Sequence, residues 1–307
     1  MNTRMWSRST TFAAIVVGAA FAVDEAARFH HIHLNVVDPE KTLKYYDTYF
    51  GSVPVTFRGI SKALLTDRSF ILLNKVDAPA PSEMITAIYH LGWGGVDGPS
   101  DFKWRDAMGI KWETPVTALG TNHYMYAYGP DNEVVEIWTG FKHYRFGHVH
   151  LFSDDVKSAT EWYVKNLGLE GPQQVRPRPE YPAGGLVRKV GEALPAGMLW
   201  ASAVQSDGVT INIFATPRNE TLNWWNYDGI KGELVKTDGR VVDHIAFSYR
   251  NIGPAFERMK ANGVEIVDAI KDREEYGIKS FFVRGPDGIL IEIVEARPIP
   301  EGLWETD

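Results

Sequence analysis

Histidine and glutamate recur at related places in this chain, and together these residue types can hold a metal ion. Four histidines each stand near the start of a stretch in which polar and apolar residues alternate, and two glutamates each lie among apolar neighbours in a later stretch. Two imidazoles and one carboxylate bind Fe(II), Mn(II) and similar ions with open coordination positions. The sequence therefore predicts one metal site in each half. The expected ligand sets are His31, His90 and Glu136 in the first half, and His148, His244 and Glu292 in the second.

Internal repeats divide the chain in a way that supports this grouping. The stretch from Phe29 to Leu34 is echoed by Phe146 to Leu151, at a constant spacing of 117 residues. The stretch from Gly129 to Ile137 is echoed by Gly285 to Ile293. We therefore predict two domains, an N-terminal one over residues 29–141 and a C-terminal one over residues 146–297. Each half repeats again, which gives four units that begin near residues 29, 87, 146 and 242.

Each unit is expected to form a strand, a helix and about three further strands. Residues 30–37 alternate between polar and apolar types, which indicates a half-buried strand. Asp38 and Pro39 are typical of the start of a helix, and Gly51 is typical of its end. The same order returns after Asp155 and ends at Gly168. The predicted fold class is therefore α+β, built from a repeated strand–helix–strands unit.

Strand parity places further polar residues beside the expected ligands. His33 and His150 share a strand face with the ligand histidines, and we predict that they orient a ligand. Asn74 and Asn212 are expected at matching places in the two halves. Each is either a hydrogen-bonding wall residue, which we favour, or a weak fourth ligand. The histidines expected at the surface are His30 and His143.

This arrangement resembles the vicinal oxygen chelate superfamily, which includes glyoxalase I, methylmalonyl-CoA epimerase, type I extradiol dioxygenases and bleomycin-resistance proteins. The resemblance covers nearly all of residues 29–297. It rests on the strand–helix motif from His31 to Gly51, on its copy from His148 to Gly168, and on the Gly-Pro-Asp turns before Glu136 and Glu292. It implies tandem paired βαβββ modules that form open barrels around a divalent metal.

The resemblance leaves three functions open. The favoured one is an extradiol-type dioxygenase that uses Fe2+ on a small catechol-like substrate, with Tyr126, ten residues before Glu136, as the residue that hydrogen-bonds the substrate. The second is a glyoxalase- or epimerase-type lyase or isomerase, which would form an enediolate with Mn2+, Zn2+, Ni2+ or Co2+. The third is a non-catalytic protein whose pocket binds a small aromatic molecule, walled by some of the ten tryptophans and thirteen tyrosines.

Composition excludes several other classes of function. The chain has 307 residues and a formal net charge of −7, which argues against a nucleic-acid-binding surface. It contains no cysteine, so disulfides, thiolate metal sites and cysteine nucleophiles are excluded. The expected partner is a small-molecule substrate, and a homo-oligomer is possible.

Two segments are interpreted apart from the repeats. Residues 1–22 have a basic start with Arg4 and Arg8, then an uncharged apolar run that ends in a small-x-small pattern. This order predicts a cleavable signal peptide, hence export to the periplasm or beyond and no membrane span after cleavage. Residues 171–205 are rich in proline and glycine and are expected to form a surface loop. The alternative is a lid whose arginines meet an anionic substrate; these are Arg176, Arg178 and Arg188.

Overall fold

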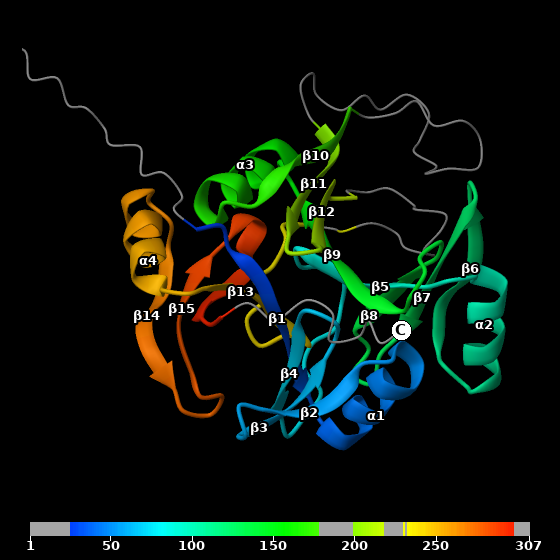
Figure 1. Ribbon diagram of the computed structural model, residues 1–307. Coiled ribbons are helices and arrows are strands. Elements are labelled where there is room, and N and C mark those ends of the chain that lie inside the picture. The colour runs from blue at the N-terminus through cyan, green and yellow to red at the C-terminus, as the bar shows by residue number, and fades with distance from the viewer. Residues whose placement is uncertain (1–24, 178–198, 218–229, 231, 298–307) are drawn as a thin grey trace, which may run out of the picture.

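The computed structural model describes residues 25–177, 199–217, 230 and 232–297. These residues form two eight-stranded mixed sheets and four α-helices. Figure 1 shows helices α1 and α2 at the lower right of the molecule and α3 and α4 at the upper left. No helix within the described ranges is both long and apolar enough to cross a membrane.

The four predicted units appear in the predicted order. The first comprises β1 (Arg28–Val36), α1 (Pro39–Phe50), β2 (Val53–Phe57), β3 (Ser61–Leu65) and β4 (Phe70–Lys75). The second comprises β5 (Ile88–Gly94), α2 (Gly98–Ala107), β6 (Trp112–Leu119), β7 (Asn122–Tyr128) and β8 (Val134–Trp138). The third comprises β9 (Arg145–Ser153), α3 (Val156–Leu167), β10 (Glu170–Pro177), β11 (Leu199–Ser206) and β12 (Val209–Ala215). The fourth comprises β13 (Val242–Tyr249), α4 (Ile252–Ala261), β14 (Ile266–Arg273), β15 (Ile278–Arg284), the 3-10 turn η1 (Pro286–Gly288) and β16 (Leu290–Glu295).

The helix boundaries follow the local signals in the sequence. The Asp38 carboxylate accepts hydrogen bonds from the backbone N–H groups of Glu40 and Lys41, and so caps the free donors at the start of α1. Gly51 ends this helix with a φ of 64°, a left-handed conformation that glycine adopts without steric cost. The third unit repeats both devices, because Asp155 caps α3 and Gly168 ends it with a φ of 72°.

The sheets do not follow the division into halves. One sheet has the order β14-β15-β16-β13-β1-β4-β3-β2, and the other has the order β10-β11-β12-β9-β5-β8-β7-β6. The first unit therefore joins the fourth through the antiparallel pair β1–β13, and the second joins the third through β5–β9. Each sheet draws one unit from each half.

The Gly-Pro-Asp turns join the two units of a half. In the first half, the Asp131 carboxylate accepts a hydrogen bond of 3.2 Å from the backbone N–H of Val37, just before α1. In the second, Asp287 accepts one of 3.1 Å from Asp154, just before α3. Each hydrogen bond thus connects the segment before a helix of one unit to the turn before the last strand of the other unit in the same half. The motif that marks the repeats is thus a structural connection between the sheets.

Several sequence predictions fall wholly or partly outside the described residues. The predicted signal peptide over residues 1–22 lies outside them, as do Arg178 and Arg188. The ends of the segment 171–205 are not a surface loop as predicted, because they complete the antiparallel strands β10 and β11. Backbone pairing between these ends outweighs the local proline and glycine content.

Candidate metal centres

One cluster of predicted ligands lies where three strands of the second sheet meet. His90 is on β5, Glu136 is on β8 and His148 is on β9, and the register sets Gly92 of β5 opposite both Glu136 and His148. Because paired residues point to the same face of a sheet, the three side chains converge. Glu136 Oε2 is 3.1 Å from His90 Nε2 and 2.7 Å from His148 Nε2, and the two nitrogens are 3.3 Å apart. We call this cluster the β5/β8/β9 centre.

Glycine at position 92 is what allows His148 to reach this centre. A Cβ atom added to Gly92 would lie 2.0 Å from His148 Cε1, far inside van der Waals contact. The imidazole therefore occupies the space that any other residue at position 92 would fill with its side chain.

Burial and mutual charge control the titration of the β5/β8/β9 centre. Burial raises the pKa of Glu136, but the adjacent His90 and His148 outweigh this effect and hold the pKa well below its usual range. Burial lowers the pKa of His90, which Glu136 only partly offsets. Glu136 is therefore ionised beside the neutral imidazole of His90, the protonation states that metal ligands require.

Aromatic side chains form the wall of the β5/β8/β9 centre. Tyr126 on β7 lies opposite Glu136, and its hydroxyl donates a hydrogen bond of 3.0 Å to Glu136 Oε1. The rings of Tyr89 and Phe152 stack beside it, with centroids 4.8 Å apart. Tyr126 thus lies beside the ligand set.

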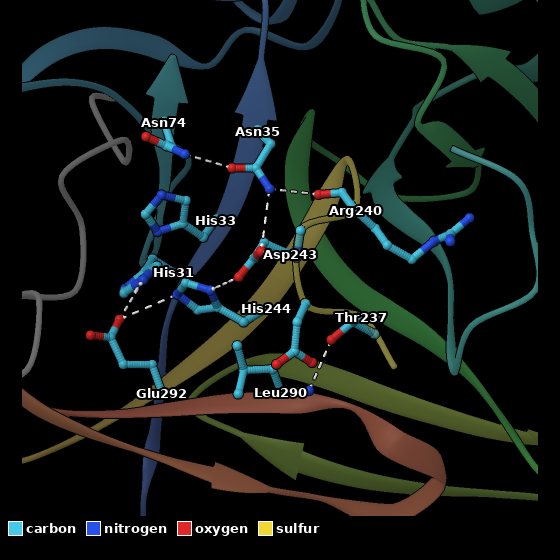
Figure 2. A network of polar contacts seen from close by, with 12 residues as sticks. His31, His33, Asn35, Asn74, Thr237, Arg240, Asp243, His244, Leu290 and Glu292 are labelled. Atoms are coloured by element: carbon cyan, nitrogen blue, oxygen red, sulfur yellow. Dashed lines mark hydrogen bonds and ion pairs between the residues drawn. The ribbon is translucent and has the colours of Figure 1, made fainter. Parts of the chain in front are cut away.

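The second cluster lies in the first sheet and comes from the two ends of the described chain (Figure 2). His31 is on β1, His244 on β13 and Glu292 on β16. Glu292 Oε2 is 3.1 Å from His31 Nε2 and 3.4 Å from His244 Nε2. Asp243 Oδ1 lies 2.6 Å from His244 Nδ1, and Ser280 donates a 2.5 Å hydrogen bond to Glu292 Oε1. We call this cluster the β1/β13/β16 centre.

The titration of the β1/β13/β16 centre is also set by burial and neighbouring charge. Burial lowers the pKa of His244, but hydrogen bonds to Asp243 and Glu292 outweigh it and raise the pKa to about 9. Burial raises the pKa of Glu292, yet His244 and His31 hold it well below its usual range. The carboxylate is therefore ionised in this centre as well.

The six predicted ligands converge, but not in the predicted groups. His148 joins His90 and Glu136, whereas His31 joins His244 and Glu292. The prediction that each site forms within one half is therefore wrong. The physical reason is the strand pairing: the opening strand of each unit pairs with the opening strand of a unit from the other half.

Three other histidines lie closer to the two centres than the sequence indicated. His33 lies with His31 and His244, and His150 with His90 and His148, such that one ligand-type atom per residue falls within 4.8 Å of the others in its group. His30, expected at the surface, is buried, and its Nδ1 is 2.8 Å from His31 Nδ1. The shared strand parity of His33 and His150 was the available signal. The burial of His30 by Phe57 and Phe70 had no local signal.

The expectation that Asn74 and Asn212 occupy matching places is wrong. Asn212 lies opposite His150, whereas His33, the counterpart of His150, lies opposite Leu72. Asn74 lies two residues further along β4, and its amide donates a 2.8 Å hydrogen bond to Asn35 Oδ1. This hydrogen bond is of the kind expected of a wall residue, the role favoured for Asn74.

The donor atoms of both centres fit a divalent cation. The buried nitrogens His31 Nε2 and His244 Nε2 have no hydrogen bond of normal geometry among the described residues, although each lies near Glu292 Oε2. Atoms that bind one ion at about 2.1 Å lie roughly 3 Å from one another when adjacent. The contacts among the donors, from 2.7 to 3.4 Å, have this length. Imidazole and carboxylate donors suit Fe, Mn, Zn and related ions.

Comparison with known proteins supports the predicted fold. The sequence model named Glyoxalase/Bleomycin resistance protein/Dioxygenase superfamily matches residues 145–293. The structure resembles glyoxalase I from Zea mays with a TM-score of 0.64 and 15% identity, over 88% of this chain and 92% of that one. It also resembles a "putative dioxygenase" from Bacillus subtilis subsp. subtilis str. 168, with a TM-score of 0.57 and 13% identity, over 90% and 87% of the two chains. The comparison with curated protein sequences gave no match. Identities this low establish the fold alone.

Proposed function

We propose that this chain, whose residues 145–293 match the Glyoxalase/Bleomycin resistance protein/Dioxygenase superfamily model, is a divalent-metal-dependent enzyme of the extradiol-dioxygenase type. The reaction is placed at the β5/β8/β9 centre, and the substrate is a small catechol-like ring with two neighbouring oxygens. The observation that carries the proposal is the convergence of His90, His148 and Glu136, with Tyr126 hydrogen-bonded to the free carboxylate oxygen.

Each residue of the centre has a distinct task. His90, His148 and Glu136 would hold the ion on one side, which leaves its other side for substrate. A bound Fe2+ would supply Lewis acidity and one-electron chemistry at this point. Tyr126 can turn its hydroxyl from Glu136 to a substrate oxygen, while Tyr89 and Phe152 stack on the ring and exclude water.

Accessibility favours this centre over the β1/β13/β16 centre. The side chain of His148 is 14% exposed, whereas those of His31 and His244 are 0% and 5% exposed. A catalytic metal site keeps a position open to substrate, whereas a structural one does not. The aromatic wall lies in the same sheet as His148.

The test compares the two glutamates at equivalent places. After anaerobic loading with Fe2+, the wild-type chain should consume oxygen in the presence of some catechols, measured with an oxygen electrode. Glu136→Ala should reduce the rate by at least about 100-fold, because it removes a ligand and the partner of Tyr126. Glu292→Ala should retain the larger share of activity. A chain that binds Fe2+ at this centre and consumes no oxygen across a panel of catechols would contradict the dioxygenase proposal.

A lyase or isomerase is the second candidate, and the position of Asn212 favours it. Asn212 on β12 lies opposite His150, two residues after His148. Glu136 on β8 lies opposite Gly92, two residues after His90. Asn212 and Glu136 therefore occupy equivalent positions in the third and second units. An amide oxygen there could complete a ligand set for a divalent ion, which would supply Lewis acidity for lyase or isomerase chemistry, while Glu136 would move a substrate proton. Substrate turnover with Zn2+ or Ni2+ and without oxygen uptake would identify this chemistry.

A further inference from the structure

We propose that the β1/β13/β16 centre is a closed, structural zinc site in which His33 is the fourth protein ligand, beside His31, His244 and Glu292. This goes beyond the reaction proposed for the β5/β8/β9 centre and does not depend on its chemistry. The proposal rests on how the remaining atoms of these four side chains are held.

Each histidine of this centre has one ring nitrogen in contact with a partner outside the ligand set. His31 Nδ1 is 2.8 Å from His30 Nδ1, His244 Nδ1 is 2.6 Å from Asp243 Oδ1, and His33 Nε2 is 3.0 Å from the Tyr276 hydroxyl. A metal-binding histidine usually donates its other ring N–H to such a partner, which fixes the ring and its tautomer. The opposite nitrogens of His31 and His244 then lie beside Glu292 Oε2 (Figure 2), and a ring nitrogen of His33 lies within 4.8 Å of ring nitrogens of these two histidines.

The carboxylates of this centre are fixed in the same way. Ser280 holds Oε1 of Glu292, which leaves Oε2 between the nitrogens of His31 and His244. Asp243 is itself held, because its Oδ2 accepts hydrogen bonds from the backbone N–H of Gly239 at 2.6 Å and from Asn35 Nδ2 at 3.2 Å. The ligand set is therefore positioned before any ion binds.

Neighbouring segments cover this centre. Tyr276 lies at the tip of the β14–β15 hairpin and reaches His33 in the first unit. The tip is attached to the first unit by a 2.7 Å hydrogen bond from Arg58 Nη1 to the Gly277 carbonyl oxygen. Buried apolar side chains pack around Tyr276; these are Phe57, Leu72, Ile278 and Val294. A covered site with four nitrogen and oxygen donors has the character of structural zinc sites, which leave no position for substrate.

In the β5/β8/β9 centre, Tyr126 holds Glu136 Oε1, but two histidines do not have such outer partners within the described part of the chain. Among the described residues, His90 Nδ1 and His150 Nε2 are buried and have no hydrogen-bond partner. The place of Asp243 before His244 is taken by Tyr89 before His90. The two centres thus share their ligand types and differ in the outer partners and in the exposure of their histidines. We therefore infer a structural role for the β1/β13/β16 centre and an open site for the β5/β8/β9 centre.

A zinc ion in the β1/β13/β16 centre would connect β1, at the start of the described chain, to β13 and β16 near its end. Binding to the folded state alone would then stabilise the whole chain. This predicts a readout that is separate from catalysis, namely the melting temperature with and without Zn2+.

The experiment compares His33→Ala with His150→Ala, which alter equivalent positions in the two centres. Each full-length variant is freed of metal by chelation, and its thermal unfolding is followed with and without a small excess of Zn2+. The wild-type chain and His150→Ala should gain several degrees in melting temperature on addition of Zn2+, and His33→Ala should lose most of this gain. Asp243→Asn should weaken Zn2+ binding by about 10- to 100-fold while the fold is kept.

The comparison within each variant removes the effect of a general loss of stability. The proposal is overturned if His33→Ala retains the full zinc-dependent gain, or if the wild-type chain gains nothing. A zinc gain in the absence of any enzymatic turnover would support this centre and leave the proposed function alone in doubt. Turnover at the β5/β8/β9 centre without a zinc-dependent rise in melting temperature would support the proposed function and contradict the structural zinc site.

Discussion

At the scale of single residues, the β5/β8/β9 centre depends on the absence of one side chain. Because a methyl group at position 92 would overlap the His148 ring, Gly92→Ala should displace this imidazole from Glu136. We expect the chain to lose one equivalent of bound metal while its far-ultraviolet circular dichroism is unchanged. Elemental analysis after dialysis measures this loss.

The neighbouring Gly147 provides the matched control for that substitution. A Cβ atom added there meets only the Arg145 carbonyl oxygen, at 4.0 Å, so Gly147→Ala should keep both metals. If Gly92→Ala binds as much metal as the wild-type chain, His148 is not a ligand in solution.

At the scale of elements, Glu133 makes the connection between β8 and α1 sensitive to pH. Its Oε1 accepts a 2.8 Å hydrogen bond from the Tyr46 hydroxyl, and burial raises the pKa of Glu133 to about 7. A carboxyl whose pKa is raised on folding does not reduce stability below the unfolded pKa, near 4.5, where both states hold the proton. As the pH rises from there to about 7, the unfolded chain ionises first and the folded state loses about 3 kcal/mol.

Glu133→Gln removes this ionisation. The change in the free energy of unfolding that it causes, measured against the wild type, should therefore be more favourable at pH 8 than at pH 4.5. The expected difference between the two pH values is about 3 kcal/mol in the free energy of unfolding, measured by urea denaturation. Glu161→Gln on α3 removes an exposed negative charge and is the control. An equal effect of Glu133→Gln at both pH values would show that the buried carboxyl does not resist ionisation.

Element order could be predicted from the sequence because its signals are local. Asp38 and Gly51 limit α1 by capping and by a left-handed backbone, and strand alternation put His31 and His33 on one face. The pairing of β1 with β13 could not be predicted in this way. Four similar units are compatible with several pairings, and the residues that meet, such as His33 and His244, are more than 200 positions apart.

The same limit explains what was missed in the site. Sequence spacing identified His31, His90, His148 and His244 but could not assign them to the two centres. The partners Asp243 and Tyr276 act through contacts that form only after the first and fourth units join. The ligand residues could be identified from the local sequence, whereas their grouping into two centres depends on strand pairing between distant units.

At the scale of the whole molecule, the two halves should be inseparable for metal binding. Each centre takes ligands from both halves, so cutting the chain between Thr139 and Phe146 separates His148 from Glu136 and His31 from Glu292. We expect residues 23–142 and residues 143–307, produced separately, to bind no metal tightly. Mixed or co-expressed, they should associate through β1–β13 and β5–β9 and recover two metals per pair. Metal analysis of the species separated by size-exclusion chromatography measures this recovery. If the C-terminal half alone bound one metal as tightly as the intact chain, His148, His244 and Glu292 would form a site within that half, and the pairing of units across the halves would not hold in solution.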